Sequence, residues 1–253
     1  MAKFPVGTEV YVPSRLLPNP DGQSFALTRT TVAAQNARSV RVNLQDTNGN
    51  DIEVASRLLH GPNLGITVLR IGDLLTEDYT LDPLAKSTLH YLRLLLQPEA
   101  IRLHEVRTTV EIQKVWERYE NATSHVVLIG HGSSDSIRLL DQTRPVNGNE
   151  LAQLLEDAAP TTVPKTFVSL SCLTGRQPFA KPFSQNRVCA DLLAPFQSVH
   201  SAAASLFAQS YFAHHLLNGE GVIAAFRHAR RAVGSGVSFR HWRSGTLTPT
   251  ASS

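Results

Sequence analysis

The chain has 253 residues, a length typical of one large domain or two smaller ones. Hydrophobic residues make up 42% and charged residues 18% of it, so a packed core can form and a wholly disordered chain is excluded. The formal net charge of +3 is too small to indicate a nucleic-acid partner. No apolar run approaches the ~18–20 residues of a membrane span, and the first residues lack the apolar stretch of a secretory signal. We therefore expect a cytoplasmic protein with no membrane partner.

The first sixty residues have the pattern of a small all-β domain. Five short runs rich in β-branched and aromatic residues lie at 8–12, 25–29, 31–34, 39–44 and 52–55. Turn signals separate the runs, and Asn48-Gly49 is a strong hairpin signal. The spacing predicts an antiparallel barrel over residues 1–60, which resembles SH3-like barrels in strand length and turn placement. Such a barrel would bind a protein activator or regulator, although a purely structural attachment fits the sequence equally well.

From residue 61 to 245 apolar strands alternate with amphipathic helices. Strands are predicted at 66–71, 100–106, 126–130, 166–171 and 198–204. Helices are predicted at 82–97, 108–120, 149–158, 187–193, 206–217 and 220–233. This alternation predicts a mostly parallel α/β sheet with helices on both faces. The Ser/Thr-rich residues 246–253 are expected to form a disordered tail.

Two of the predicted parallel strands end on reactive side chains. His131 and Gly132 follow the strand at 126–130, and Cys172, forty-one residues after His131, follows the strand at 166–171. A right-handed crossover makes these strands near neighbours, so we expect both side chains at the same edge of the sheet. An imidazole can take the proton of a nearby thiol, and a glycine lets backbone N–H approach a substrate oxyanion. The pattern indicates nucleophilic catalysis without a metal or other cofactor.

The flanks of this pair resemble the caspase-like cysteine peptidases, and most closely their bacterial CHAT branch. Residues 170–175 are similar to the CHAT signature Leu-Ser-Ala-Cys-x-Thr-Gly with one residue fewer before the cysteine, and residues 204–207 are similar to its Ala-Ser-Leu-Trp segment. The resemblance covers residues 64–233 and excludes the barrel. It implies a caspase-like fold and a thiol endopeptidase released by a partner or signal; in bacteria such enzymes often act in antiviral or cell-death systems.

The resemblance also implies roles for individual residues. His131 would be the general base and later the general acid, and Cys172 the nucleophile. The backbone N–H groups of Gly132 and Cys172 would hold the oxyanion. A substrate peptide would pair as an added strand, in a groove lined by Ser205, Leu206, Phe207 and Asp135. Leu170 stands where relatives that cut after Arg or Lys often carry an acid, so the cleavage preference stays open.

The segment after Cys172 and the remaining candidate groups lead to three further expectations. Residues 173–187 are predicted as a polar loop that gates the site by ordering or by self-cleavage, and a plain exposed loop fits equally well. Cys189 is expected to lie in a helix and to be core. His214 and His215 are adjacent on a predicted helix and therefore point apart, which makes them a poor metal pair.

Two other functions stay open. One is a catalytically dead caspase-like scaffold that binds a partner through its barrel, because a fold does not guarantee an activity. The other is an α/β-hydrolase, since residues 128–133 also resemble its His-Gly oxyanion loop. The nucleophile elbow Gly-x-Ser-x-Gly of that class is missing, because Ser133 stands one place too late and no closing glycine follows.

Overall fold

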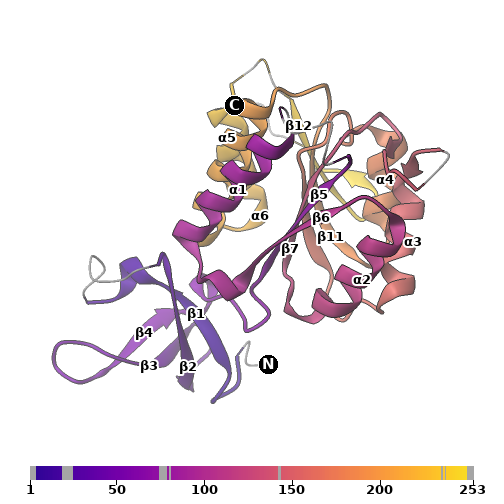
Figure 1. Cartoon of the computed structure of the whole chain (residues 1–253). Coiled ribbons are helices and arrows are strands. Elements are labelled where there is room, and N and C mark those ends of the chain that lie inside the picture. Colours follow the sequence, from indigo (N-terminus) through magenta and orange to yellow (C-terminus); the bar gives the residue numbers. More distant parts are fainter. Residues whose placement is uncertain are drawn as a thin grey trace.

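The computed structural model describes residues 4–18, 25–73, 79, 81–141, 144–234, 236 and 238–249. These residues form a seven-stranded, mostly parallel sheet with helices on both faces and a separate four-stranded antiparallel sheet (Figure 1). The predicted mixed α/β class is therefore confirmed. In the same residues no helix has both the length and the apolar composition needed to cross a membrane.

The N-terminal sheet is a run of four consecutive antiparallel strands. They are β1 (Glu9–Pro13), β2 (Leu27–Gln35), β3 (Ser39–Gln45) and β4 (Asp51–Ala55). The runs predicted separately at 25–29 and 31–34 form the single strand β2, because no turn residue interrupts them. One isolated bridge between Tyr11 and His60 adds a further pairing at the free edge of β1. The finer likeness to an SH3-like barrel stays a prediction.

The large sheet has the strand order β13-β12-β11-β10-β7-β5-β6. Its parallel strands are β5 (Ile66–Ile71), β6 (Ile101–Val106), β7 (His125–Ile129), β10 (Lys165–Ser169) and β11 (Cys189–Pro195). Two antiparallel strands, β12 (Phe239–Arg243) and β13 (Thr246–Leu247), extend one edge. A separate short ribbon joins β8 (Ser136–Ile137) to β9 (Val146–Asn147). The strands β5, β7 and β10 are buried along their whole length, as a sheet covered on both faces requires.

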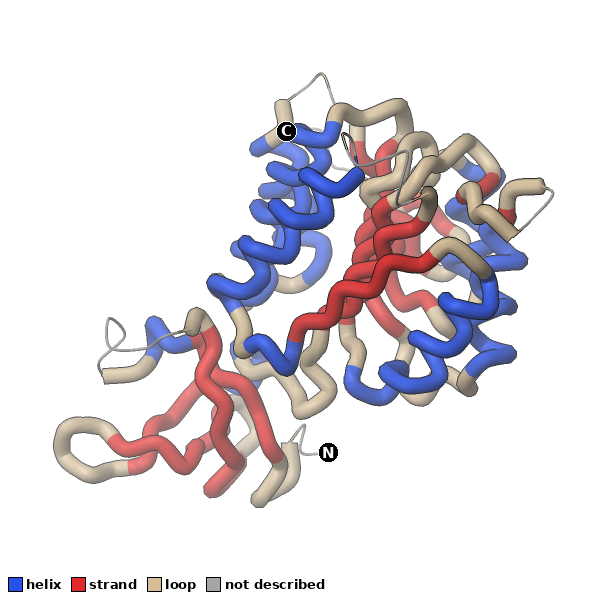
Figure 2. The backbone as a smooth tube through the Cα atoms, in the orientation of Figure 1, coloured by secondary structure: helices blue, strands red, loops and turns tan. Residues whose placement is uncertain are grey.

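Helices cover the two faces of this sheet in separate groups (Figure 2). One face carries α1 (Leu81–Leu95), α5 (Ser201–Phe212) and α6 (Val222–Ala232), whose apolar side chains share one core. The other carries α2 (Thr109–Tyr119), α3 (Gly148–Ala158) and α4 (Gln177–Gln185), which share a second core. Capping boxes begin α2 and α3, where Thr108 pairs with Glu111 and Asn147 with Glu150.

The N-terminal sheet packs against the amino ends of the parallel strands (Figure 1). Tyr11 and Leu27 belong to the same core cluster as α1 and α5, and the Arg15 guanidinium donates to the Asn218 carbonyl at 3.0 Å. A pocket between the two parts is lined by Phe4 and His60 on one side and by His125 of β7 on the other. The N-terminal sheet has a core of its own that includes Val10 and Val40, and Tyr11 and Leu27 connect it to the core of the large sheet.

Three local predictions are wrong. Residues 187–193, predicted as a helix, hold the first part of β11, because an apolar run buried on both sides has no periodicity that separates strand from helix. Residues 198–204, predicted as a strand, include the start of α5, where three consecutive alanines favour helix. The predicted tail at 246–253 is ordered at its start, because Thr246 and Leu247 pair with β12. Residues 250–253 lie outside the described residues.

The predicted gating loop at 173–187 is also different in the structure. Most of it is the helix α4, whose Phe179 and Phe183 are fully buried. Phe183 packs edge-on against Phe167 of β10, with ring centroids 4.9 Å apart. The prolines that made the segment look like a loop lie in the helix, where Pro178 occupies the first turn and Pro182 the interior. Tertiary packing therefore overrides the local loop pattern.

Candidate active site

The strands that precede His131 and Cys172 are direct neighbours in the sheet. Ser169 of β10 is level with Leu128 of β7, and the Leu170 N–H donates to the Leu128 carbonyl at 2.8 Å. Because both strands run in the same direction, both end at one edge. The structure therefore brings the two reactive residues to the same carboxyl edge of the sheet, as the sequence predicted.

The loops that carry the two residues are in direct contact at Gly132. A Cβ atom built on Gly132 would lie 2.5 Å from the Cys172 carbonyl oxygen and 3.1 Å from Ser171 Cβ. Any side chain would push the loops apart, so glycine is required here for close approach. An isolated antiparallel β-bridge pairs Gly132 with Ile137. In it the Arg138 N–H donates to the His131 carbonyl at 3.0 Å, and the Ser133 N–H donates to the Ser136 carbonyl at 2.8 Å.

Two backbone N–H groups on these contacting loops, those of Gly132 and Cys172, have no acceptor among the described residues. The bridge uses groups on either side of Gly132, so the Gly132 N–H lies outside its hydrogen bonds. Within the described residues, neither this N–H nor that of Cys172 donates a hydrogen bond. Two such donors on contacting loops are the groups that the sequence assigned to an oxyanion hole.

The backbone of the cysteine loop has an unusual, firmly held shape. Leu173 has a φ of +66°, in the left-handed region that non-glycine residues rarely adopt. The Thr174 hydroxyl donates to the Ser171 carbonyl at 2.8 Å and lies 2.7 Å from the Ser169 hydroxyl. Ser169, Ser171 and Thr174 are all fully buried. Their network holds the strained backbone next to Cys172, a combination that clusters at functional sites.

The two cysteines lie in contrasting environments. Cys172 is partly exposed, and its Sγ accepts a hydrogen bond from the Val199 N–H at 3.4 Å. The same Sγ lies 3.8 Å from the Val199 carbonyl oxygen, to which the thiol can donate. Cys189 is only 6% exposed, at the start of β11, and burial followed by the nearby Asp191 raises the pKa of its thiol well above the usual value. Cys189 is core as predicted, but in a strand instead of a helix.

Asp135 follows the histidine loop and is exposed. The Ser133 hydroxyl donates to its carboxylate at 2.6 Å and the Ser136 hydroxyl at 2.9 Å, and these two hydrogen bonds, in that order, lower its pKa. The carboxylate is therefore ionised at neutral pH. Its predicted part in a substrate pocket stays a prediction.

The predicted substrate segment at Ser205, Leu206 and Phe207 has a different structure from the one expected. All three lie in α5, whose backbone groups pair within the helix, so they offer no edge for an added peptide strand. Phe207 is fully buried and stacks on Phe239 with ring centroids 3.6 Å apart, so it lines no groove. The prediction of strand pairing at these residues is wrong.

Ser205 and Leu206 instead line a cavity of about 560 Å³ beside α1 and α5. The other lining residues are Tyr79, Pro83, Leu84, Ser87, His200, Ser201, Ala202 and Gln209. Leu206, which lines this cavity, is 46% exposed to solvent. His200 directly follows Val199, which contacts the Cys172 sulfur, so the cavity and the thiol share one loop.

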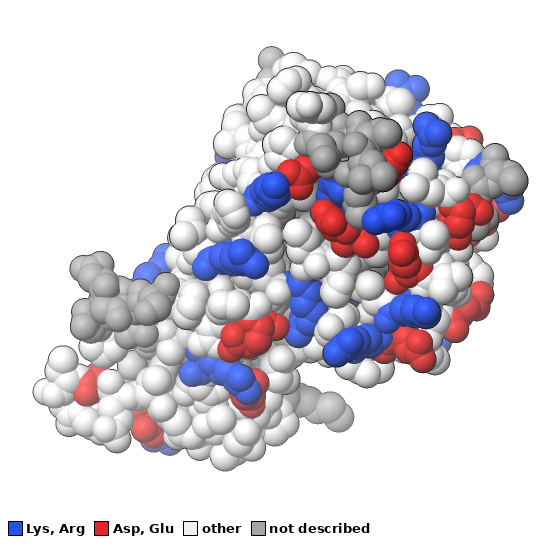
Figure 3. Space-filling view, in the orientation of Figure 1, with Lys and Arg blue, Asp and Glu red and all other residues white. Residues whose placement is uncertain are grey.

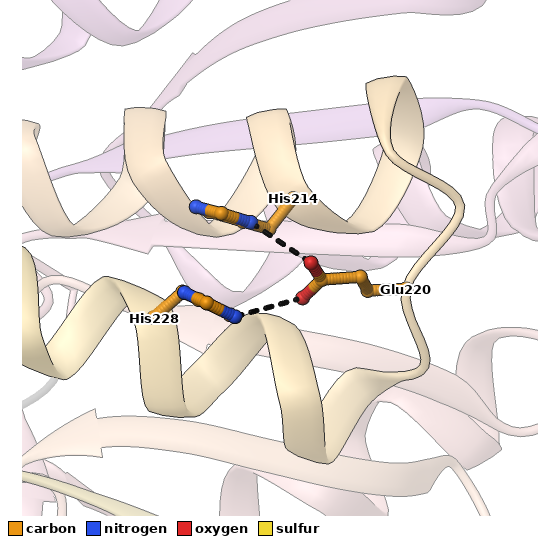
Figure 4. A group of neighbouring side chains, drawn as sticks. All are labelled: His214, Glu220 and His228. Carbon is orange, nitrogen blue, oxygen red and sulfur yellow. Dashed lines mark hydrogen bonds and ion pairs between the residues drawn. The ribbon is translucent and has the colours of Figure 1, made fainter.

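One group of side chains among the described residues could hold a metal ion: His214, Glu220 and His228, drawn in Figure 4. The sequence did not predict this group, because His214 has an adjacent histidine, His215, that points away from it, and no other ligand stands at a helical spacing. The three residues are six and eight positions apart, and only the folded turn between two helices brings them together. No short-range spacing signal existed that could have found them.

Surface charge and comparison with known proteins add little to the chemistry of the site. On the face shown in Figure 3, basic and acidic side chains are interspersed over the large domain.

No protein-family model and no curated protein matches the chain. The resemblance to caspase-like peptidases therefore depends on the residues of this chain alone.

Proposed function

We propose that the chain is a caspase-like cysteine endopeptidase in which Cys172 is the nucleophile and His131 the general base. The observation that carries the proposal is the contact of Gly132 with the Cys172 backbone. This contact joins the loops of an imidazole and a partly exposed thiol at the carboxyl edge of two neighbouring parallel strands. The strained backbone at Leu173 adds independent support.

The proposed reaction is acyl transfer in two steps. His131 takes the Cys172 proton, the sulfur attacks the scissile carbonyl carbon, and the Gly132 and Cys172 N–H groups hold the resulting oxyanion. The C–N bond then breaks, and His131 gives the proton to the leaving amine, which leaves a thioester on Cys172. Water, deprotonated by His131, hydrolyses the thioester, and the proton returns to the sulfur. No metal or redox cofactor is needed for this balance.

The cavity beside α5 supports a preference for uncharged substrate side chains. Its apolar walls include Leu84 and Leu206. Among the lining residues, His200 and Tyr79 are the two with an ionisable side chain. Asp135 supports the opposite preference, for a basic residue, if its carboxylate meets the substrate. A peptide library separates the two, because cleavage after apolar residues favours the cavity and cleavage after Arg or Lys favours Asp135.

Control by a partner at the N-terminal sheet is part of the proposal. This sheet lies at the amino ends of the strands and the thiol at their carboxyl ends, so a partner bound there would not block the substrate. Self-cleavage inside α4 is disfavoured, since it would require unfolding a helix with two buried phenylalanines. We expect the active enzyme to keep an intact chain through 177–185, and an intact-mass measurement checks this.

The test uses the full chain and three matched variants. Wild type, Cys172→Ala, His131→Ala and Cys189→Ala are treated with a thiol-reactive peptide probe and with a positional-scanning peptide library, with and without candidate activating proteins. We expect one equivalent of label and peptide turnover in wild type and Cys189→Ala. Turnover should fall by at least about 1000-fold in Cys172→Ala and His131→Ala.

The outcomes separate the competing functions. Turnover retained in Cys172→Ala would remove the peptidase proposal. Turnover retained in His131→Ala would show that the assigned base is wrong. Labelling of wild type equal to that of Cys172→Ala, together with no turnover under any condition, would identify a catalytically dead scaffold.

A further inference from the structure

We propose that His214, Glu220 and His228 form a binding site for a divalent transition-metal ion, with zinc as the best match. The site lies away from the thiol, where the chain turns from α5 into α6 next to the N-terminal sheet. The inference does not depend on the proposed peptidase activity, and its test has a readout of its own.

The local fold brings the three side chains together. Helix α5 continues into a π-helical turn, η6 (Ala213–Leu217), which carries His214. Gly219, with a φ of +67°, then reverses the chain, and the Glu220 N–H donates to the His214 carbonyl at 3.0 Å. His228 lies on α6, which packs alongside. π-Helical turns are rare and occur frequently at functional sites.

The side chains point toward one common position, as Figure 4 shows. His214 Nδ1 lies 3.1 Å from one Glu220 oxygen, and His228 Nε2 lies 3.6 Å from the other. The two imidazole rings stack with centroids 4.0 Å apart. One ligand atom from each residue falls within 4.8 Å of the other two. Bonds of about 2.0–2.1 Å to a tetrahedral ion place the ligand atoms about 3.4 Å apart. The two nearly parallel rings would therefore have to rotate toward each other as the group closes on the ion.

One oxygen of this group has only an ion-pair contact, to His228 Nε2 at 3.6 Å, and no hydrogen bond among the described residues. Glu220 Oε2 is buried and accepts no hydrogen bond from the described residues. A buried carboxylate oxygen without a donor is costly, and a cation would remove that cost. The Asn218 side-chain amide nitrogen lies 3.2 Å from His214 Nδ1, the atom that faces Glu220, so an ion bound at Nδ1 would displace this amide contact.

The donor set decides which ion fits. Two imidazole nitrogens and one carboxylate oxygen match zinc and its neighbours, whereas calcium and magnesium prefer oxygen ligands alone. Three protein ligands leave a fourth position for water. The same turn contacts the N-terminal sheet: the Asn218 carbonyl accepts from Arg15, and Leu58 packs over Gly219. A bound ion would therefore stabilise the turn on which the two parts of the molecule meet.

Zinc and cobalt titrations of the full chain test the proposal. All proteins carry Cys172→Ala, so that the thiol cannot bind the metal, and are first stripped with a chelator. Bound zinc is measured by native mass spectrometry, the unfolding midpoint by calorimetry, and tetrahedral cobalt by its visible absorption. The site variant is His228→Gln, and the control is His90→Gln, which removes an exposed histidine of α1.

The parent chain and His90→Gln should each bind one zinc ion with a higher unfolding midpoint. His228→Gln should bind zinc at least about 100-fold more weakly, since even the loss of a residue that hydrogen-bonds to a metal ligand costs about 10–100-fold in affinity. Glu220→Gln provides the same comparison if His228→Gln does not fold. No zinc binding by the parent chain, or equal binding by the parent and the site variants, would overturn the proposal and leave a simple His–Glu cluster.

Discussion

The carboxyl and amino ends of the parallel strands differ in backbone strain and in the exposure of their polar groups. At the carboxyl end, the structure holds a partly exposed thiol, a left-handed Leu173 and contacting backbone loops. At the amino end, it holds an apolar interface with the N-terminal sheet that has a pocket beside it, the ion pair of Lys165 with Glu120, and the buried His125. Backbone strain and a partly exposed thiol at the carboxyl end favour chemistry there, whereas a buried ion pair and a buried neutral histidine at the amino end favour a role in stability.

From this contrast we expect variants at the two ends of the strands to differ in their effects on stability and on turnover. Changes at the amino end should lower the free energy of unfolding while the turnover of each folded molecule stays the same. Changes at the carboxyl end should lower turnover more than stability. The following variants test that separation.

Removing the buried lysine should have the largest effect. Lys165 and Glu120 are 1% and 2% exposed, and their charged groups lie 2.8 Å apart. Burial alone would raise the pKa of Glu120, but Lys165 and then Thr162 lower it. Lys165→Met would leave a buried carboxylate without its partner and should lower the free energy of unfolding by about 3–5 kcal/mol. Urea unfolding at pH 7 measures this change.

The control removes the charge on both sides. Lys165→Met combined with Glu120→Gln should recover part of the lost stability, because no unpaired buried charge remains. If the double variant were as unstable as the sum of the two single ones, the ion pair would not be the cause. A fall in turnover per folded molecule would break the separation between the two ends.

The contact between the two site loops gives the second prediction. Gly132→Ala places a Cβ 2.5 Å from the Cys172 carbonyl oxygen and should displace Cys172, the proposed nucleophile. Relieving this clash would move the Cys172 loop, and a displacement of about 1 Å should lower kcat by about 100-fold. Gly221→Ala is the matched control, since its φ of −64° suits any residue and a Cβ there meets nothing within 4 Å. Full activity in Gly132→Ala would mean that the contact does not position the thiol.

Much of the architecture around the site could be predicted from the sequence. The run at 126–130 is apolar on both sides, which is typical of a central strand, and the rule for parallel strands then places His131 and Cys172 at one edge. Both inferences need only local pattern and topology. They do not depend on which side chains pack together.

The errors occur where long-range packing decides. Helix α4 contains two prolines and reads as a loop, yet Phe183 packs on Phe167 and stabilises it as a helix. The run that begins β11 is apolar enough for either structure, and only its neighbours in the sheet select the strand. The group of His214 with Glu220 and His228 forms only across a folded turn. Local periodicity carries none of this information.

A third prediction concerns the contact between the two parts of the molecule. Gly219 has a φ of +67°, and a Cβ there would lie 2.5 Å from Leu58 Cδ2. Gly49 has a similar φ of +79° with nothing within 4 Å, so Gly49→Ala should cost only the backbone strain of about 1–2 kcal/mol. Gly219→Ala should cost more, and adding Leu58→Ala should reduce the difference. Equal losses for the two glycine variants would show that the interface is loose.

The smallest effect is a dependence of stability on pH at the amino end. Burial, then the charges of His215 and His60, lower the pKa of His125 well below its usual value. Its ring also meets Phe212 and Tyr211, and its Nδ1 lies 2.8 Å from the Ser124 hydroxyl. The unfolded chain therefore binds a proton that the folded chain excludes. Stability should be complete above pH ~6.5 and should fall below it, by at most about 1.4 kcal/mol per pH unit for this histidine.

The variant His125→Phe isolates this contribution. It keeps an aromatic ring of similar size but cannot titrate, so the loss of unfolding free energy between pH 7.5 and 5.5 should be smaller than in wild type. Part of the loss should remain, because burial also lowers the pKa of His104 and His215. His90→Gln, at an exposed position, should leave the loss unchanged. An identical loss in His125→Phe and wild type would mean that His125 is hydrated in solution and that the amino end is more open than its packing indicates.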